Sequence, residues 1–112
     1  AIGPYSQAIV VNDMVFTSWQ IALKPDGSFL EGDVEAQATQ VLENLQAVLA
    51  EAGSSLQKVV KTTIFLANMD DFAKVNSVYG SFFGEHKPAR STVGVKTLPR
   101  NALVEIEAIA VK

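Results

Sequence analysis

The chain has 112 residues, enough for one domain and too few for two, so residues 1–112 are assigned to a single domain. It has no cysteine, one histidine, 9 basic and 12 acidic residues, and a net charge of −3. These counts exclude disulfides, thiolate metal sites and cysteine nucleophiles, and the acidic balance argues against nucleic acid as the main partner. Mean hydropathy is +0.20, and no apolar run approaches the roughly 20 residues of a membrane span. The apolar excess therefore indicates a buried subunit interface.

The N-terminal part of the chain predicts a β-hairpin followed by a turn. Residues 7–11 and 14–18 are short runs of apolar and β-branched side chains, separated by the polar pair Asn12-Asp13. Residues 24–27, Lys-Pro-Asp-Gly, then predict a turn that ends any regular element.

An amphipathic helix is predicted from Val34 to about Ala52. Asp33 can cap its N-terminus, and Gly53 follows where a left-handed residue would end it. Its apolar residues form one stripe at helical spacing. They are Val34, Ala38, Val41, Leu42, Leu45, Val48, Leu49 and Ala52.

A strand and a second helix are predicted next. Residues 56–66 are extended and β-branched, with apolar residues on both faces from Val59 onward. Asn68 or Asp70 can cap the second helix, and Gly84 ends it. One face of this helix carries Phe72, Val75, Val78, Tyr79 and Phe82.

Two late strands, residues 91–98 and 103–111, flank the turn at residues 99–101, so we predict that they pair as a hairpin. In the last strand one parity (Val104, Ile106, Ala108, Ala110) is suited to lie under helices. The other combines the aliphatic Leu103, Ile109 and Val111 with the carboxylates Glu105 and Glu107. The element order ββαβαββ predicts an α+β fold with two helices on one face of a four- or five-stranded sheet. We expect other copies of the chain to bury the second face.

Arg90 and Glu105 are the first candidates for chemistry, because the predicted hairpin brings them into the same region. Two interpretations remain open: a cross-strand ion pair, or an anion-binding arginine beside a carboxylate that handles water. Glu107 has an equal claim by composition. Tyr5 is either a packing residue or a hydroxyl placed over a pocket. His86 lies in a polar connector, and we predict a solvated loop residue rather than a catalyst.

Four separated blocks of the sequence resemble the signature motifs of the reactive intermediate deaminase (RidA, also called YjgF) family. They are Ile2-Gly3-Pro4-Tyr5-Ser6-Gln7, Val59-Val60-Lys61-Thr62-Thr63, Pro88-Ala89-Arg90-Ser91 and Glu105-Ile106-Glu107-Ala108-Ile109-Ala110. The resemblance covers the whole chain. It implies a homotrimer of chorismate-mutase-like subunits with mixed sheets inside, helices outside and active sites between neighbours. The implied activity is hydrolysis of 2-imino acids such as 2-iminopropanoate and 2-iminobutanoate, released from enamines such as 2-aminoacrylate, to 2-oxo acids and ammonia. It implies no cofactor and no metal.

The resemblance also implies roles for individual residues. Arg90 matches the arginine that binds the substrate carboxylate, Glu105 the glutamate that orients water, and Tyr5 the pocket tyrosine. Ser18 matches the serine of the family's Ser-Gly-Gln block and is assigned to substrate binding. Thr92 stands where family members often have cysteine, at a substrate-binding position that contributes mainly through its backbone, so threonine should be tolerated.

Trp19 departs from the family, which has glycine there and uses its backbone N–H near the substrate carboxylate. Tryptophan keeps that N–H and adds a large ring. Strict alternation after Ser18 would point the ring away from the pocket, whereas a bulge in the strand would bring it in. We expect partial intrusion at the pocket rim, and hence a bias toward small imino acids.

A competing prediction is a non-catalytic trimer that binds small carboxylates or acts on RNA and translation. The acidic charge disfavours a phosphate-neutralising RNA surface. No signal peptide or basic amphipathic presequence is visible at the start of the chain, although the missing initiator methionine leaves room for a segment before Ala1. We therefore predict a cytoplasmic location, with the mitochondrion as the alternative.

Overall fold

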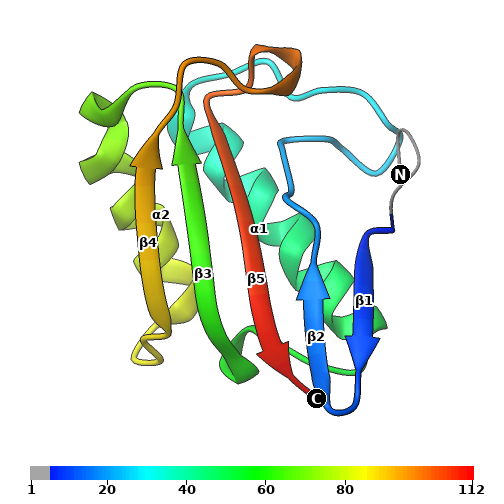
Figure 1. Cartoon of the computed structure of the whole chain (residues 1–112). Helices are drawn as coiled ribbons and strands as arrows, with labels where there is room; N and C mark the ends of the chain where they lie inside the picture. Colours follow the sequence, from blue (N-terminus) through cyan, green and yellow to red (C-terminus); the bar gives the residue numbers. More distant parts are fainter. Residues whose placement is uncertain (1–5) are drawn as a thin grey trace.

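The computed structural model describes residues 6–112, so the predicted pocket residue Tyr5 lies outside the described part. A five-stranded sheet has the strand order β1-β2-β5-β3-β4 (Figure 1). The strands are β1 (Ala8–Val11), β2 (Met14–Thr17), β3 (Val59–Leu66), β4 (Ala89–Gly94) and β5 (Val104–Val111), and the helices are α1 (Val34–Glu51) and α2 (Phe72–Phe83). The predicted element order is confirmed.

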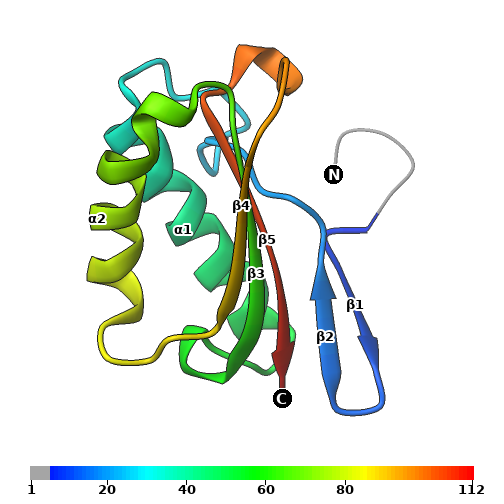
Figure 2. The same ribbon diagram turned by 60° about the vertical axis from the view of Figure 1, so that its left-hand side comes forward.

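Both helices cover the same face of the sheet, as Figure 2 shows. The β3–β4 pair is parallel and the other strand pairs are antiparallel, so the sheet is mixed. The prediction of an α+β domain with two helices on one face is confirmed. No helix in residues 6–112 is long and apolar enough to cross a membrane.

The predicted hairpin between the two late strands is wrong. The crossover through α2 returns β4 parallel to β3, as helical crossovers do, and β5 then pairs with the other edge of β3. The connection from β4 to β5 passes over the end of β3. There the Val95 N–H donates to the Leu66 carbonyl, and the Ala67 N–H donates to the Leu103 carbonyl. Since β3 separates them, β4 and β5 are not neighbours.

The predicted cap of α1 is confirmed, whereas Asn68 caps the 3-10 turn Met69–Asp71 that precedes α2, and the N-cap of α2 itself, Asp71, forms no side-chain cap hydrogen bond within the described residues. Asp33 Oδ1 accepts a 2.8 Å hydrogen bond from the Ala36 N–H at the start of α1, and Asn68 Oδ1 accepts one from the Asp70 N–H in the turn before α2. Gly84 ends α2 with φ +61°, a conformation that glycine adopts without strain. The α1 stripe is buried against the sheet, with Val41, Leu42, Leu45 and Leu49 fully inaccessible.

The other face of the sheet is open and largely apolar. In β5 the even-numbered residues are buried and the odd-numbered ones, except Glu105, are only half-buried, as the alternation predicts. Leu103 precedes the strand and packs against the core rather than lying on this face. Large apolar side chains remain exposed on β1, β2, β4 and the segment after β2. They include Ile9, Phe16, Trp19 and Val93. The predicted subunit interface would bury this open face.

Candidate active site

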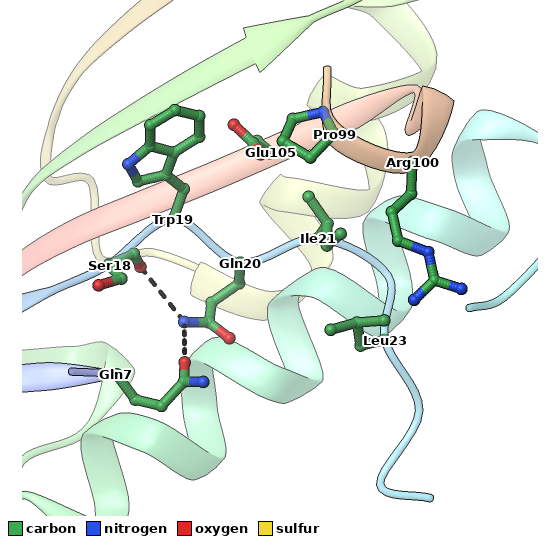
Figure 3. Close-up of a pocket in the computed structure, with 9 residues that line it drawn as sticks. All are labelled: Gln7, Ser18, Trp19, Gln20, Ile21, Leu23, Pro99, Arg100 and Glu105. Carbon is green, nitrogen blue, oxygen red and sulfur yellow. Dashed lines mark hydrogen bonds between the residues drawn. The ribbon is translucent and has the colours of Figure 1, made fainter. Parts of the chain in front are cut away.

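A cavity of about 480 Å³ opens at the end of the sheet where β5 begins (Figure 3). Its walls come from the residue before β1, the segment after β2, the 3-10 turn before β5, and β5 itself. The lining residues are Gln7, Ser18, Trp19, Gln20, Ile21, Leu23, Pro99, Arg100 and Glu105. Most of the lining surface is apolar, and Glu105 supplies its one carboxylate.

Glu105 is buried, although it belongs to the open face of the sheet. Only 2% of the residue is exposed, and no group within residues 6–112 forms a hydrogen bond with its Oε2 atom. Burial, and secondarily the charge of Glu107, raise the pKa of Glu105 from its ordinary 4.5 to about 7. Near neutral pH this carboxyl group can therefore both accept and return a proton, as a general acid–base catalyst must.

A hydrogen-bond network fixes the wall beside β1. Gln20 Nε2 donates to Gln7 Oε1 at 3.1 Å and to the Ser18 carbonyl at 3.2 Å (Figure 3). The Ser18 N–H donates to the Gln7 carbonyl, and the Ser18 hydroxyl donates to the Ser6 carbonyl. Ser18 thus lines the cavity with its hydroxyl proton already engaged.

The chain bulges between β2 and Gln20. Phe16 is aligned with Ile109, and Gln20 is aligned with Ile106. Four steps along one side therefore oppose three along the other, which is one extra residue. The extra residue places Trp19 on the open face together with Phe16, and Trp19 lines the cavity.

The Trp19 ring lies beside Phe65, with a centroid separation of 5.9 Å, and 54% of the residue is exposed. Of the two alternatives drawn from the sequence, the bulge is the one that the structure shows. The ring lines the cavity, and its expected intrusion into a substrate pocket stays a prediction.

Arg90 is not near Glu105 within the subunit. Arg90 is aligned with Thr62 on one edge of β3, and Glu105 is aligned with Phe65 on the other. Arg90 also extends toward α2, on the helix side of the sheet, whereas Glu105 lies on the open side. The alternative of an intrachain Arg90–Glu105 ion pair is therefore wrong.

Residues of α2 hold the Arg90 guanidinium. Its Nη1 donates to Asn76 Oδ1 at 2.6 Å, and its Cζ lies 5.0 Å from the ring centroid of Tyr79 and 5.6 Å from that of Phe72. Both distances are within cation–π range. The Tyr79 hydroxyl is itself paired with Thr62 Oγ1 at 2.7 Å. The Arg90 guanidinium is thus held in place on an edge strand before any ligand binds. Its other N–H groups can donate hydrogen bonds to an anion.

A second cavity, of about 430 Å³, lies beside Arg90 and extends to His86. His86 Nε2 lies 2.7 Å from the Val59 carbonyl oxygen, so the ring is half-buried and bonded to the backbone rather than free in a solvated loop. Thr92 follows Arg90 by two residues. No group in the described part of the chain forms a hydrogen bond with its buried Oγ1.

Sequence reasoning assigned no site role to several residues of these cavities, among them Gln20, Asn76 and Arg100. Asn76, the partner of Arg90, lies on the exposed side of α2, and its pattern carries no signal. Arg100 lines the Glu105 cavity, and its guanidinium lies 5.6 Å from the Phe29 ring. The sequence assigns Arg100 only to a turn. That turn directly precedes β5, so proximity to Glu105 could have been predicted.

The sequence and the structure of this chain are similar to those of known proteins. The endoribonuclease L-PSP family model matches residues 1–112. MMF1, a mitochondrial protein of Saccharomyces cerevisiae, is 47% identical over 112 residues, which are 100% of this chain and 77% of MMF1. The structure of E. coli TdcF with bound serine is 46% identical with a TM-score of 0.94, and that of RidA from the Antarctic bacterium Psychrobacter sp. is 42% identical with a TM-score of 0.95. Each match covers 100% of this chain and 91% of the other.

Proposed function

This chain belongs to the endoribonuclease L-PSP family, which includes the YjgF, RutC and Rid proteins, and from this premise we propose that it is an imine deaminase. Its substrates would be small 2-imino acids such as 2-iminopropanoate and 2-iminobutanoate, which arise from enamines such as 2-aminoacrylate. The products would be 2-oxo acids and ammonia. The observation that carries the proposal is Glu105, a buried carboxyl group with a pKa of about 7, in a cavity with apolar walls, whose Oε2 atom has no hydrogen-bond partner among residues 6–112.

The reaction needs one group that both takes and gives a proton. The Glu105 carboxylate accepts a proton from water while the water oxygen bonds to the carbon of the protonated imine (C=NH2+) and the C=N electron pair moves to nitrogen, which leaves a neutral amino group. The protonated carboxyl group then returns that proton to the amino nitrogen. As the C–N bond breaks, the hydroxyl proton passes to Glu105 and the C=O bond forms, releasing ammonia. A pKa near the working pH suits both directions of transfer.

The substrate carboxylate would be bound by Arg90 of a neighbouring subunit in a homotrimer. Arg90 lies on an edge strand, where a second subunit can approach, and the open face has the apolar surface that such an interface needs. Thr92 would add backbone contacts, Ser18 and Trp19 would line the other wall, and Tyr5 would supply its hydroxyl. The serine held by TdcF supports this model, because serine also carries a nitrogen and a carboxylate on one carbon.

RNA cleavage is the alternative that the family's description names. The chain carries 12 acidic and 9 basic residues, a balance opposite to the positive surfaces that bind phosphate backbones. A non-catalytic carboxylate-binding trimer would use Arg90 but would have no need of a buried carboxyl group such as that of Glu105. For location we propose the cytoplasm or, as for MMF1, the mitochondrion.

The test measures ammonia release from freshly generated 2-iminobutanoate. Glu105→Gln is expected to lower kcat by about 10²–10⁴-fold, the usual contribution of a general acid–base group. Glu107→Gln is the matched control, since it makes the same change two residues away on the same face. Equal losses in the two variants, or a larger loss for Glu107→Gln, would refute the assignment of Glu105. Cleavage of RNA without imine hydrolysis would refute the proposed activity.

A further inference from the structure

The aromatic ring in the Glu105 cavity lies where it limits the space for a substrate side chain. Trp19 is the largest side chain of the lining, and its ring lies beside Phe65, the cross-strand neighbour of Glu105. In Figure 3 the Glu105 carboxyl group is seen between the Trp19 ring and Pro99. A substrate whose imine carbon reaches Glu105 must therefore direct its side chain past the ring.

A buried threonine holds the bulge that puts the ring there. The Thr17 Oγ1 atom accepts a 2.9 Å hydrogen bond from the Ala108 N–H of β5, and only 8% of Thr17 is exposed. The Thr17 side-chain oxygen thus accepts a hydrogen bond from the β5 backbone, next to the point where the register against β5 changes. Loss of that acceptor would leave the buried Ala108 N–H without this partner, which would destabilise the bulge.

The ring cannot turn to the helix face. Val15 and Ala22, which precede and follow the bulge on that face, are fully buried in the core, and close-packed cores have no room for an added indole. The ring therefore stays on the open face as long as the bulge persists.

We infer that Trp19 sets an upper limit on the side-chain size of the substrate, with Thr17 as the residue that positions it. The inference rests on the proposed function and names its substrate class: 2-imino acids with short, unbranched aliphatic side chains. The apolar walls formed by Ile21, Leu23 and Pro99 suit such side chains, and the ring excludes branched and aromatic ones. Steric selection of this kind is worth about 10–200-fold in kcat/KM.

Variants of Trp19 can be tested in the folded protein, because the ring is half-exposed and contributes little to the core. Phe16→Ala is a matched control: Phe16 is an exposed aromatic residue on the same face, 42% accessible, and does not belong to the cavity lining. For Thr17, the Val variant removes the hydroxyl and the Ser variant keeps it.

The experiment compares kcat/KM for imino acids generated in place by an amino-acid oxidase from alanine, leucine and phenylalanine. Trp19→Ala should raise the phenylalanine-to-alanine ratio at least about 10-fold, and Phe16→Ala should leave the ratio unchanged. Thr17→Val should raise the ratio in the same direction, and Thr17→Ser should preserve it. An active Trp19→Ala variant with an unchanged ratio would overturn the inference about Trp19. An unchanged ratio in Thr17→Val would overturn the role of Thr17.

Failure of the proposed function gives a different result. A wild-type protein that accelerates none of the three hydrolyses would overturn the deaminase activity. Affinity for the corresponding 2-oxo acids, measured by calorimetry and by Trp19 emission, then tests the size limit directly. Tighter binding of phenylpyruvate than of pyruvate by the wild type, or no binding of either, would overturn the limit as well.

Discussion

Glu105→Gln is expected to stabilise the protein at alkaline pH, although it removes the proposed catalytic group. Burial favours the neutral form of the carboxyl group, so the pKa of Glu105 is raised from 4.5 to about 7. The folded state then binds the proton more tightly than the unfolded state does. The group does not destabilise the fold below pH 4.5, destabilises it increasingly between pH 4.5 and 7, and reaches a constant destabilisation above that range.

The size of the effect follows from the two pKa values. At 1.36 kcal/mol per pH unit, the shift from 4.5 to about 7 corresponds to roughly 3 kcal/mol at pH 8.5. At pH 5 the same linkage gives less than about 1 kcal/mol. Glutamine has nearly the same shape and no charge. Any difference in packing between Gln and neutral Glu is the same at both pH values and cancels when they are compared.

The measurement is urea denaturation of both proteins at pH 5 and pH 8.5, at equal protein concentration because an oligomer's stability depends on it. The stability of Glu105→Gln relative to the wild type should increase by roughly 2–3 kcal/mol between the two pH values. Glu107→Gln, the half-buried control, should show a much smaller change, since Glu107 is only the second cause of the raised pKa. If the difference in stability between Glu105→Gln and the wild type did not depend on pH, the pKa of Glu105 would not be raised by burial in the folded state.

Three further predictions concern the site. Arg90→Lys should raise KM for 2-iminobutanoate by about 10-fold or more, because an ammonium does not replace a bidentate guanidinium. The control Arg100→Lys should change KM much less. A larger increase in KM for Arg100→Lys than for Arg90→Lys would assign carboxylate binding to Arg100. The pH profile of kcat, which reports the enzyme–substrate complex, should rise with an inflection near 7 as Glu105 ionises, and Glu107→Gln should shift that inflection to lower pH; an unshifted profile would assign the inflection to another group. Light scattering at micromolar concentration should give a trimer mass, and a monomer mass would contradict the model in which sites form between subunits.

The parts of the fold predicted from sequence are those set by local patterns. The apolar stripe of α1, its cap at Asp33 and the termination of α2 at Gly84 each depend on residues within one or two turns, and all are found in the structure. Strand pairing is set by distant segments, and there the prediction failed. The helix between β3 and β4 was the available signal, because a helical crossover joins parallel strands. The short turn before β5 suggested a hairpin instead.

The same distinction applies to the candidate site. Alternation along β5 placed Glu105 on the open face, but its cavity is lined by Trp19 and Pro99, which come from other parts of the chain. Alternation also left two directions open for Trp19, because the extra residue of a bulge becomes visible only in the register against β5. Asn76 was missed because its partner Arg90 is brought to it by the β3–β4 pairing.

The separation of Arg90 from Glu105 within the subunit affects the pKa of Glu105. The predicted hairpin would have placed the two side chains close together. An arginine beside Glu105 would favour its ionised form and lower its pKa, and a carboxylate of low pKa is a weak base toward water at neutral pH. On the observed topology, Asn76 and the Tyr79 ring hold the Arg90 guanidinium on the helix side, while the Glu105 carboxyl group is buried on the open side, with no hydrogen-bond partner for its Oε2 atom in the described part of the chain. In the proposed trimer the substrate carboxylate would lie between the two groups and neutralise the arginine, so Glu105 would keep the pKa of about 7 that its burial gives it.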